Sequence, residues 1–294
     1  SYLGESKPWG NVGSMENSGI EVDLGYKFNT GDWNFKVGGN ISYLKNKLIN
    51  LGNSDGFEMK DNVHQLGNVS RAENGEVYPF FYGYKTAGIF QNQAQIDAYV
   101  NNKGEKLQPN AEPGDVIFID TNKDGTISDT DRTKIGKGTP DWTYGLNFQA
   151  SWKDIDFSML IAGSIGNDIF DATRRIDLRY VNLSGEMMDR WHGEGTSNTV
   201  PRFTWANNTD HRSVSFAFSY MRLKNIQLGY TLPKDLTSKA FISSLRIYVA
   251  AENLLTLTGY KGFDPEISYD ASAGIDRGIY PQARTFTVGL NLNF

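Results

Sequence analysis

Cysteine is absent from the 294-residue chain, and so is any apolar run of the roughly 18 residues that a membrane-spanning helix needs. Without cysteine the chain has no disulfide framework and no cysteine-based metal or thiol chemistry. A net positive charge is lacking as well, because 29 Lys and Arg stand against 34 Asp and Glu. A nucleic-acid partner is therefore excluded, since neutralising phosphates requires clustered basic residues.

Glycine and aromatic residues are, by contrast, plentiful. The chain has 31 Gly, 17 Phe, 15 Tyr and 6 Trp but only 9 Pro, a composition typical of many strands joined by polar turns. The mean hydropathy of -0.47 ordinarily indicates a soluble protein. The strands of an outer-membrane barrel give an equally low value, because residues that face lipid alternate with residues that face the water-filled interior.

Seven segments alternate apolar and polar residues with the period of two that a β-strand requires. The alternation in one of them changes parity near Asn225, which predicts a β-bulge there. The predicted strands are 20–28, 33–43, 142–152, 155–165, 220–230, 245–251 and 285–294.

Aromatic residues mark both ends of two of these strands. Trp33 and Tyr43 lie ten residues apart on one face, as do Trp142 and Trp152. Ten residues at about 3.3 Å each, tilted by about 45°, rise roughly 23 Å, close to the height of the apolar band between the two aromatic girdles of an outer-membrane barrel. This spacing favours a membrane barrel over a soluble β-sandwich, whose strands alternate in the same way.

Short and long connections alternate along the chain, as they do in outer-membrane barrels, whose short turns are periplasmic and whose long loops are extracellular. Seven is an odd number, whereas a bacterial barrel closes with an even number of antiparallel strands, so we expect more protein before Ser1. The short links are 29–32, 153–154 and 231–243, and the long loops are 46–141, 166–219 and 254–284.

The chain ends in a pattern that resembles the assembly signal of outer-membrane proteins, with Thr287, Gly289, Leu292 and Phe294 at its four positions. A series of further segments carries specific motifs along the chain. They are 11–21, 138–142, 190–191, 200–203, 220–233, 251–254, 262–266 and 280–281. In content and order these segments resemble the C-terminal third of SusC-type TonB-dependent transporters.

This resemblance implies an all-β fold, a transmembrane antiparallel β-barrel with long extracellular loops, of which residues 1–294 are the C-terminal part. About seven of roughly 22 strands would be present, and the plug and the N-terminal strands would be missing. It also implies a transporter in the outer membrane of a Gram-negative, Bacteroidetes-like bacterium, not an enzyme. The implied partners are a SusD-like surface lipoprotein, TonB acting through the missing N-terminal part, outer-membrane lipid, and an imported oligosaccharide or peptide.

The long loop 46–141 contains a twelve-residue segment, 120–131, that matches the calcium-loop template. The template places oxygen ligands at positions 1, 3, 5, 7, 9 and 12 and a glycine, here Gly125, at the sharp turn. Position 12 is Asp instead of the usual Glu, and the preceding residues 116–119 favour a strand over a helix. The expected ligands of a structural calcium ion are Asp120, Asn122, Asp124, Thr126, Ser128 and Asp131; an Asx-rich turn without metal is the alternative.

The sequence identifies no catalytic residues, and it leaves the substrate-binding residues unassigned. Aromatic side chains in the long loops can stack on sugar rings, although packing within the loops is their more common role. These aromatic residues are Tyr78, Phe80, Phe81, Tyr82, Trp191 and Trp205. Short helices are predicted at 92–101 and 184–191. The competing interpretation of the whole chain is a soluble, calcium-binding β-sandwich that binds carbohydrate.

Overall fold

The computed structural model describes residues 13–63, 67–173, 182, 184–204, 214–267 and 274–294. The chain forms two compact units, each assembled from segments that are distant in sequence. One unit, here called the wall unit, comprises Ser18–Lys45, Thr139–Ile169 and Ser215–Phe294. The other, here called the loop unit, comprises Ser1–Asn17, Asn46–Gly138 and Phe170–Val214.

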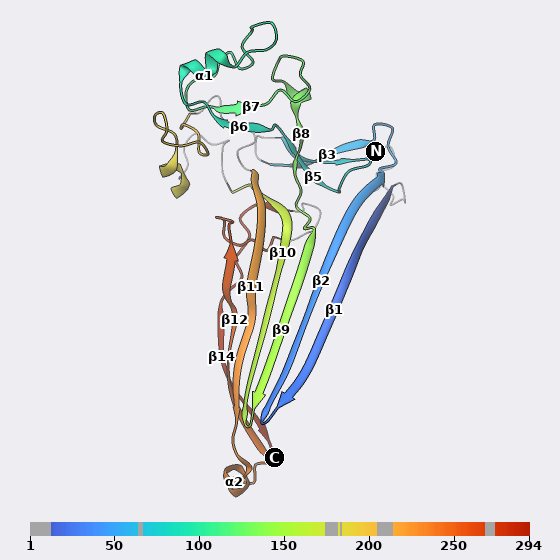
Figure 1. Cartoon of the computed structure of the whole chain (residues 1–294), viewed down its shortest axis with the longest axis vertical. Helices are drawn as coiled ribbons and strands as arrows, with labels where there is room; N and C mark the ends of the chain where they lie inside the picture. Colours follow the sequence, from blue (N-terminus) through green and yellow to red (C-terminus); the bar gives the residue numbers. More distant parts are fainter. Residues whose placement is uncertain (1–12, 64–66, 174–181, 183, 205–213, 268–273) are drawn as a thin grey trace, which may run out of the picture. The chain divides into compact units, whose positions relative to one another are not determined.

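The wall unit is built on a single antiparallel sheet with the strand order β1-β2-β9-β10-β11-β12-β14, and a two-residue strand, β13, pairs with β10 (Figure 1). Every predicted strand is present. The strands are β1 Ser14–Thr30, β2 Trp33–Asn50, β9 Trp142–Trp152, β10 Ile155–Asp171, β11 Val214–Thr231, β12 Ser244–Thr258, β13 Ile275–Asp276 and β14 Thr285–Asn293.

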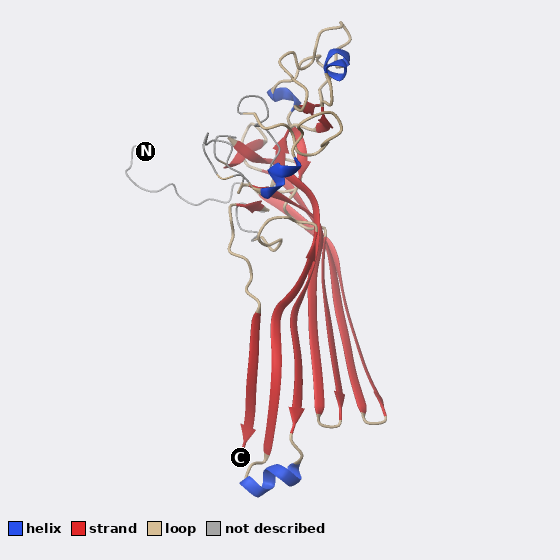
Figure 2. Cartoon of the chain, turned by 90° about the vertical axis from the view of Figure 1, so that its left-hand side faces the viewer, coloured by secondary structure: helices blue, strands red, loops and turns tan. Residues whose placement is uncertain are grey.

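Several strands extend beyond the alternating segments that predicted them. β10 continues to Asp171 and β11 begins at Val214, because backbone pairing does not end where the apolar alternation ends. Two of the short links are tight, since β1 and β2 are joined by Gly31 and Asp32, and β9 and β10 by Lys153 and Asp154. The third link contains α2 Lys234–Thr237 and the 3-10 turn η4 Ser238–Ala240 (Figure 2).

One face of the sheet is apolar and exposed. The strand register places like residues side by side, with Trp33 opposite Trp152 and Tyr43 opposite Trp142. The Trp33 and Trp152 rings stack at 5.8 Å and the Tyr43 and Trp142 rings lie 4.8 Å apart, so the two predicted aromatic positions form rows across neighbouring strands. Large exposed side chains of this face include Ile20, Leu24, Tyr26, Ile247, Val249, Phe286, Val288 and Leu290.

The opposite face of the sheet is polar and contains an ion pair that spans three strands. Arg246 of β12 donates to both carboxylate oxygens of Asp156 of β10, at 2.8 and 2.5 Å. The guanidinium passes over Gly229 of β11, where a Cβ would lie only 2.3 Å from Arg246 Nη2. A glycine is needed at that position for the pair to form. On the same face Asn147 covers Gly38 of β2.

The predicted bulge is present, since the register of β11 and β12 shifts between Leu223 and Asn225. Their partners are Leu255 and Glu252, so β12 advances three residues while β11 advances two, and the additional residue lies in β12. Asn253 adopts a positive φ of 51° there. The prediction was therefore correct about the position of the bulge but assigned it to the wrong strand. The parity change in β11 has another cause, because charged residues replace apolar residues on one face of that strand.

The loop unit contains a small four-stranded sheet with the order β3-β4-β5-β8 and a two-stranded sheet, β6-β7. Its core includes the fully buried side chains of Val63, Phe81, Phe90 and Ile96. The elements are β3 Phe57–Asn62, β4 Asn68–Glu73, β5 Phe80–Gly83, β6 Thr86–Ile89, α1 Gln93–Ala98, β7 Val116–Phe118, η2 Asp129–Asp131, β8 Thr133–Gly136 and η3 Gly185–Asp189.

Both predicted short helices are present in the loop unit, as α1 and as the 3-10 turn η3. The strand predicted before the acidic segment is also present, as β7. In the described part of the chain, none of the helices has the length and apolar character needed to span a membrane.

Candidate functional site

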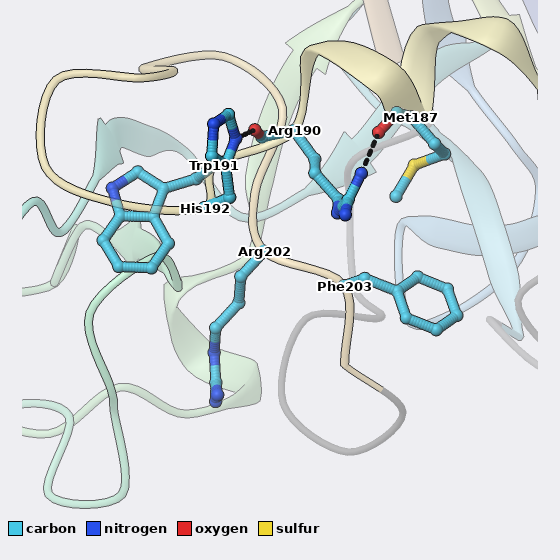
Figure 3. A pocket seen from close by; sticks show the side chains of 6 residues that line it. All are labelled: Met187, Arg190, Trp191, His192, Arg202 and Phe203. Atoms are coloured by element: carbon cyan, nitrogen blue, oxygen red, sulfur yellow. Dashed lines mark hydrogen bonds between the residues drawn. The ribbon is translucent and has the colours of Figure 1, made fainter.

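A pocket of about 550 Å³ lies in the loop unit (Figure 3). It is lined by the segment after β10 that contains η3, and its lining combines cationic and aromatic side chains. Arg190 donates through Nη1 to the Met187 carbonyl at 3.2 Å, and His192 Nδ1 lies 3.0 Å from the Arg190 carbonyl. The lining residues are Met187, Arg190, Trp191, His192, Arg202 and Phe203.

Arg202 and Trp191 attach this segment to the loop before β7. The Arg202 guanidinium binds Asp115 at 2.7 Å and Glu112 at 2.5 Å, and the carboxylate of Asp115 is almost completely buried. The hydrogen bond that Arg202 donates to Asp115, assisted by the negative charges of Asp115 and Glu112, raises the pKa of Arg202 against the opposing effect of burial. Gly114, at φ 94°, lies under the indole of Trp191, where a Cβ would be 2.4 Å from the ring.

The Arg202 guanidinium is thus bound by two carboxylates, whereas the Arg190 guanidinium has a partner of a different kind. Within the described residues, Arg190 forms no ion pair and has the Met187 carbonyl as its acceptor. A guanidinium beside exposed aromatic carbon can bind a carboxylate or stack on a planar group. The pocket therefore has the chemistry to bind an anionic or a planar ligand.

The aromatic candidates from the sequence serve mainly in packing. Phe80 and Phe81 are buried, and the Tyr82 ring lies between the guanidinium groups of Arg71 and Arg132 at 4.7 and 5.1 Å. Trp191 lines the pocket but also packs on Gly114, and Trp205 lies outside the described residues.

The predicted calcium loop forms a closed network of side chain to backbone hydrogen bonds. Asp120 Oδ2 accepts from the Gly125 N–H at 2.8 Å, and Asn122 Oδ1 accepts from the Asp124 N–H at 2.9 Å. Asp131 is fully buried, and its oxygens accept from the N–H groups of Thr121 and Ser128, each at 2.8 Å. These bonds hold the ends of the segment together.

Three observations bear on whether this loop holds a cation. Asp120 Oδ1 is buried and has no hydrogen-bond partner, although its sister oxygen is satisfied. On the other hand, no three His, Asp or Glu side chains converge as a metal site anywhere in the described residues. Hydrogen bonds from Thr126 and Asn122 lower the pKa of Asp124, so this exposed carboxylate is ionised at neutral pH. The calcium ion therefore remains a prediction.

The four residues of the predicted assembly signal lie on and just after the edge strand β14. Thr287 and Gly289 alternate with the apolar row of β14, and the ring of Tyr248 covers Gly289, where a Cβ would be 2.2 Å from the ring. Leu292 and Phe294 share the parity of the apolar row, and both are exposed. Their role in assembly stays a prediction.

Sequence reasoning missed a buried ion-pair cluster in the wall unit. Arg222 of β11 is 2% exposed and binds Asp264 and Glu266, each at 2.6 Å, while Lys224 binds Glu266 at 2.6 Å. The segment 262–266 had been noted only for its family resemblance. Acidic residues two positions apart, opposite two basic residues with the same spacing, were the available signal.

The TonB-dependent receptor P3 of Formosa agariphila is 32% identical over 305 residues, which cover 100% of this chain and 30% of that protein. The TonB-dependent receptor SusC of Bacteroides thetaiotaomicron is 28% identical over 290 residues, covering 97% of this chain and 27% of that protein. No family model matches the chain.

Among solved structures, the RagAB peptide importer in its open-open state has a TM-score of 0.73 and 26% identity, and the match covers 97% of this chain and 29% of that one. The chain belongs to the SusC/RagA type of TonB-dependent receptors. It spans about 30% of the length of its relatives. These matches confirm the predicted family, fold class and outer-membrane location.

Proposed function

We propose that this SusC/RagA-type chain forms part of the wall and loops of an importer for oligosaccharides or peptides, powered through TonB and covered by a SusD-like surface lipoprotein. The observation that carries the proposal is the two-faced sheet, apolar on the exposed side and polar on the other. A strand with one apolar and one polar face fits between hydrocarbon and a water-filled interior. The RagAB importer, which has a similar structure, takes up peptides.

The soluble carbohydrate-binding sandwich fits these observations poorly. A sandwich buries the apolar face of each sheet against another sheet. In the described residues, by contrast, the apolar side chains of β1, β12 and β14 are exposed, including Leu24, Val249 and Val288.

Uptake by cells tests this proposal. Cells that carry the complete receptor should accumulate a labelled oligosaccharide or peptide, and both deletion of the receptor gene and a protonophore should abolish the accumulation. Uptake that depends on neither would overturn the proposal. The released solute should be chemically unchanged, whereas a modified product would indicate an enzyme.

We also propose that segment 120–131 binds calcium, with Asp120 Oδ1 as its first ligand and Asn122, Asp124, the Thr126 carbonyl, Ser128 through water and Asp131 completing the set. The buried, unpartnered Asp120 Oδ1 supports this assignment, because a buried anionic oxygen without a partner carries a large free-energy penalty that a bound cation removes. Calcium would cross-link the two ends of the segment and stabilise the loop unit around it.

Calcium binding to the complete receptor can be measured by calorimetry, with protease sensitivity of the loop as a second measure. Asp120→Asn should weaken binding by about tenfold or more, because it removes the negative charge from the first ligand. Asp129→Asn is the matched control, since Asp129 lies in the same segment outside the ligand positions and accepts a hydrogen bond from Tyr84. The assignment is contradicted if titration with calcium releases or absorbs no binding heat and if chelation of calcium leaves proteolysis of the loop unchanged.

A further inference from the structure

The link between β11 and β12 differs from the other two links at the same end of the sheet. The others consist of two residues each, whereas this link, residues 232–243, contains α2 and η4 (Figure 2). It remains attached to the wall at both ends, because the Leu232 N–H donates to the Leu245 carbonyl and the Ser243 N–H donates to the Asn293 carbonyl, each at 2.8 Å. A turn this long is not needed to connect two antiparallel neighbours.

Two of the side chains that this link exposes are large and apolar. Phe241 is 91% exposed and Leu236 is 58% exposed, while Thr237 is the residue that the link buries. The other exposed residues of the link are polar and carry one net positive charge, from Lys234 and Lys239 against Asp235, with Ser238 and Ser243 uncharged. A short segment that combines exposed aromatic and aliphatic side chains with lysines has the composition of an interfacial membrane anchor.

The backbone of Phe241 provides an independent observation. Phe241 ends η4 with φ 60° and ψ 27°, in the left-handed region. Glycine is the usual residue at such a helix end, and a bulky side chain there is strained. The ring is 91% exposed, so packing within the described residues does not offset this strain.

We infer that residues 232–243 form a membrane foot, in which Phe241 and Leu236 insert into the lipid leaflet next to the wall and Lys234 and Lys239 bind anionic headgroups. The inference goes beyond the proposed import function and rests on the outer-membrane location. The apolar face of the wall leads directly to the foot through Tyr230 and Ile247, both exposed, and Trp33 and Trp152 form an aromatic row at the same end. Aromatic rows of this kind lie at the lipid–water interface.

Site-directed spin labelling of the complete receptor tests the foot, and this chain offers no native cysteine that would compete for the label. The receptor is reconstituted in vesicles of phosphatidylethanolamine and phosphatidylglycerol, and collisions of the label with oxygen and with a water-soluble nickel chelate are compared. Phe241→Cys and Leu236→Cys should show an oxygen-to-nickel ratio several-fold above that of Asp32→Cys in the tight turn. Vesicles without phosphatidylglycerol should lower the ratio at residue 241.

A label on Val249→Cys, on the apolar face of the wall, distinguishes failure of the foot from failure of the wall's placement in the membrane. If residue 249 contacts lipid and residue 241 behaves like residue 32, the foot lies in water and the inference is wrong. If residue 241 is shielded from both reagents, a protein covers it and the inference is equally wrong. If residue 249 is also accessible to nickel, the membrane placement of the wall itself fails.

Discussion

At the scale of single residues, glycines determine how closely neighbouring strands and side chains approach. Gly163 of β10 lies under Tyr144, whose hydroxyl donates to the Tyr220 carbonyl at 3.3 Å. A Cβ at this position would be 2.2 Å from the Tyr220 carbonyl oxygen, which is backbone and cannot rotate away. Gly25 of β1 is a contrasting case, since a Cβ there would meet nothing within 4 Å.

Gly163→Ala should therefore destabilise the barrel by about 1–3 kcal/mol, because the added methyl group forces β10 and β11 apart. Gly25→Ala should leave stability unchanged within about 0.5 kcal/mol. Detergent electrophoresis after heating measures the stability of both variants. The midpoint is the temperature at which the complete receptor no longer migrates as a compact, folded species. Equal midpoints for the two would refute the close approach at Gly163.

At the scale of elements, ion pairs attach the connection that follows β12 to the neighbouring strand β11. Asp264 lies in that connection and accepts from the N–H groups of Gln282 and Glu266 at 2.8 Å, in addition to Arg222. Burial opposes ionisation of Asp264, but these hydrogen bonds and the charge of Arg222 outweigh it and lower its pKa. The ionised carboxylate thus organises the connection around Arg222.

Asp264→Ala should loosen residues 259–267 and 274–284 and destabilise the folded state by about 3 kcal/mol, because it leaves Arg222 buried with a single carboxylate. Trypsin should then cleave after Lys261 or Arg277 faster than in the unmodified receptor. Glu58→Ala, which removes an exposed pair with Lys60 at 3.3 Å, should cost below about 1 kcal/mol. Unchanged cleavage in the Asp264 variant would contradict the attachment.

The same carboxylate makes the attachment dependent on pH. Because the folded pKa of Asp264 lies below its ordinary value of 3.8, its contribution is complete above that value and is lost as the pH falls through the lowered pKa. Hydrogen exchange of this connection should therefore accelerate only under strongly acidic conditions. Acceleration that begins near neutral pH would assign the change to another group.

At the scale of the whole molecule, the sequence predicted the wall far better than the loops. Period-two alternation depends on which face each residue presents, so all seven long strands were identified. The aromatic residues noted at the two ends of strands 33–43 and 142–152 form rows in the structure, with Trp33 stacked on Trp152. The Arg202–Asp115 pair and the pocket were not predicted, because they join residues 87 positions apart without any local pattern. The acidic turn 120–131 was identified because all its members are adjacent in sequence.

The two faces of the wall should respond differently to charge. Val249→Arg places a guanidinium on the lipid side and should destabilise the barrel by up to about 2–4 kcal/mol, depending on its depth in the bilayer. Gln227→Arg, on the opposite face of the neighbouring strand, should be tolerated, since that side is polar. The amount of folded receptor recovered from the outer membrane measures the effect of each variant. Similar losses for the two would contradict the assigned faces.

Two contacts join distant segments of the loop unit, because Trp191 packs on Gly114 and Arg202 pairs with Asp115. They have a practical consequence for chimeric receptors. A designer who grafts residues 46–138 from one receptor onto another would bring the glycine without its indole and the carboxylate without its guanidinium. In a recipient that lacks an equivalent guanidinium and indole, Asp115 would be buried without its counterion and Gly114 would lose the ring that covers it. Residues 46–138 should therefore be exchanged together with 184–204 as a matched set.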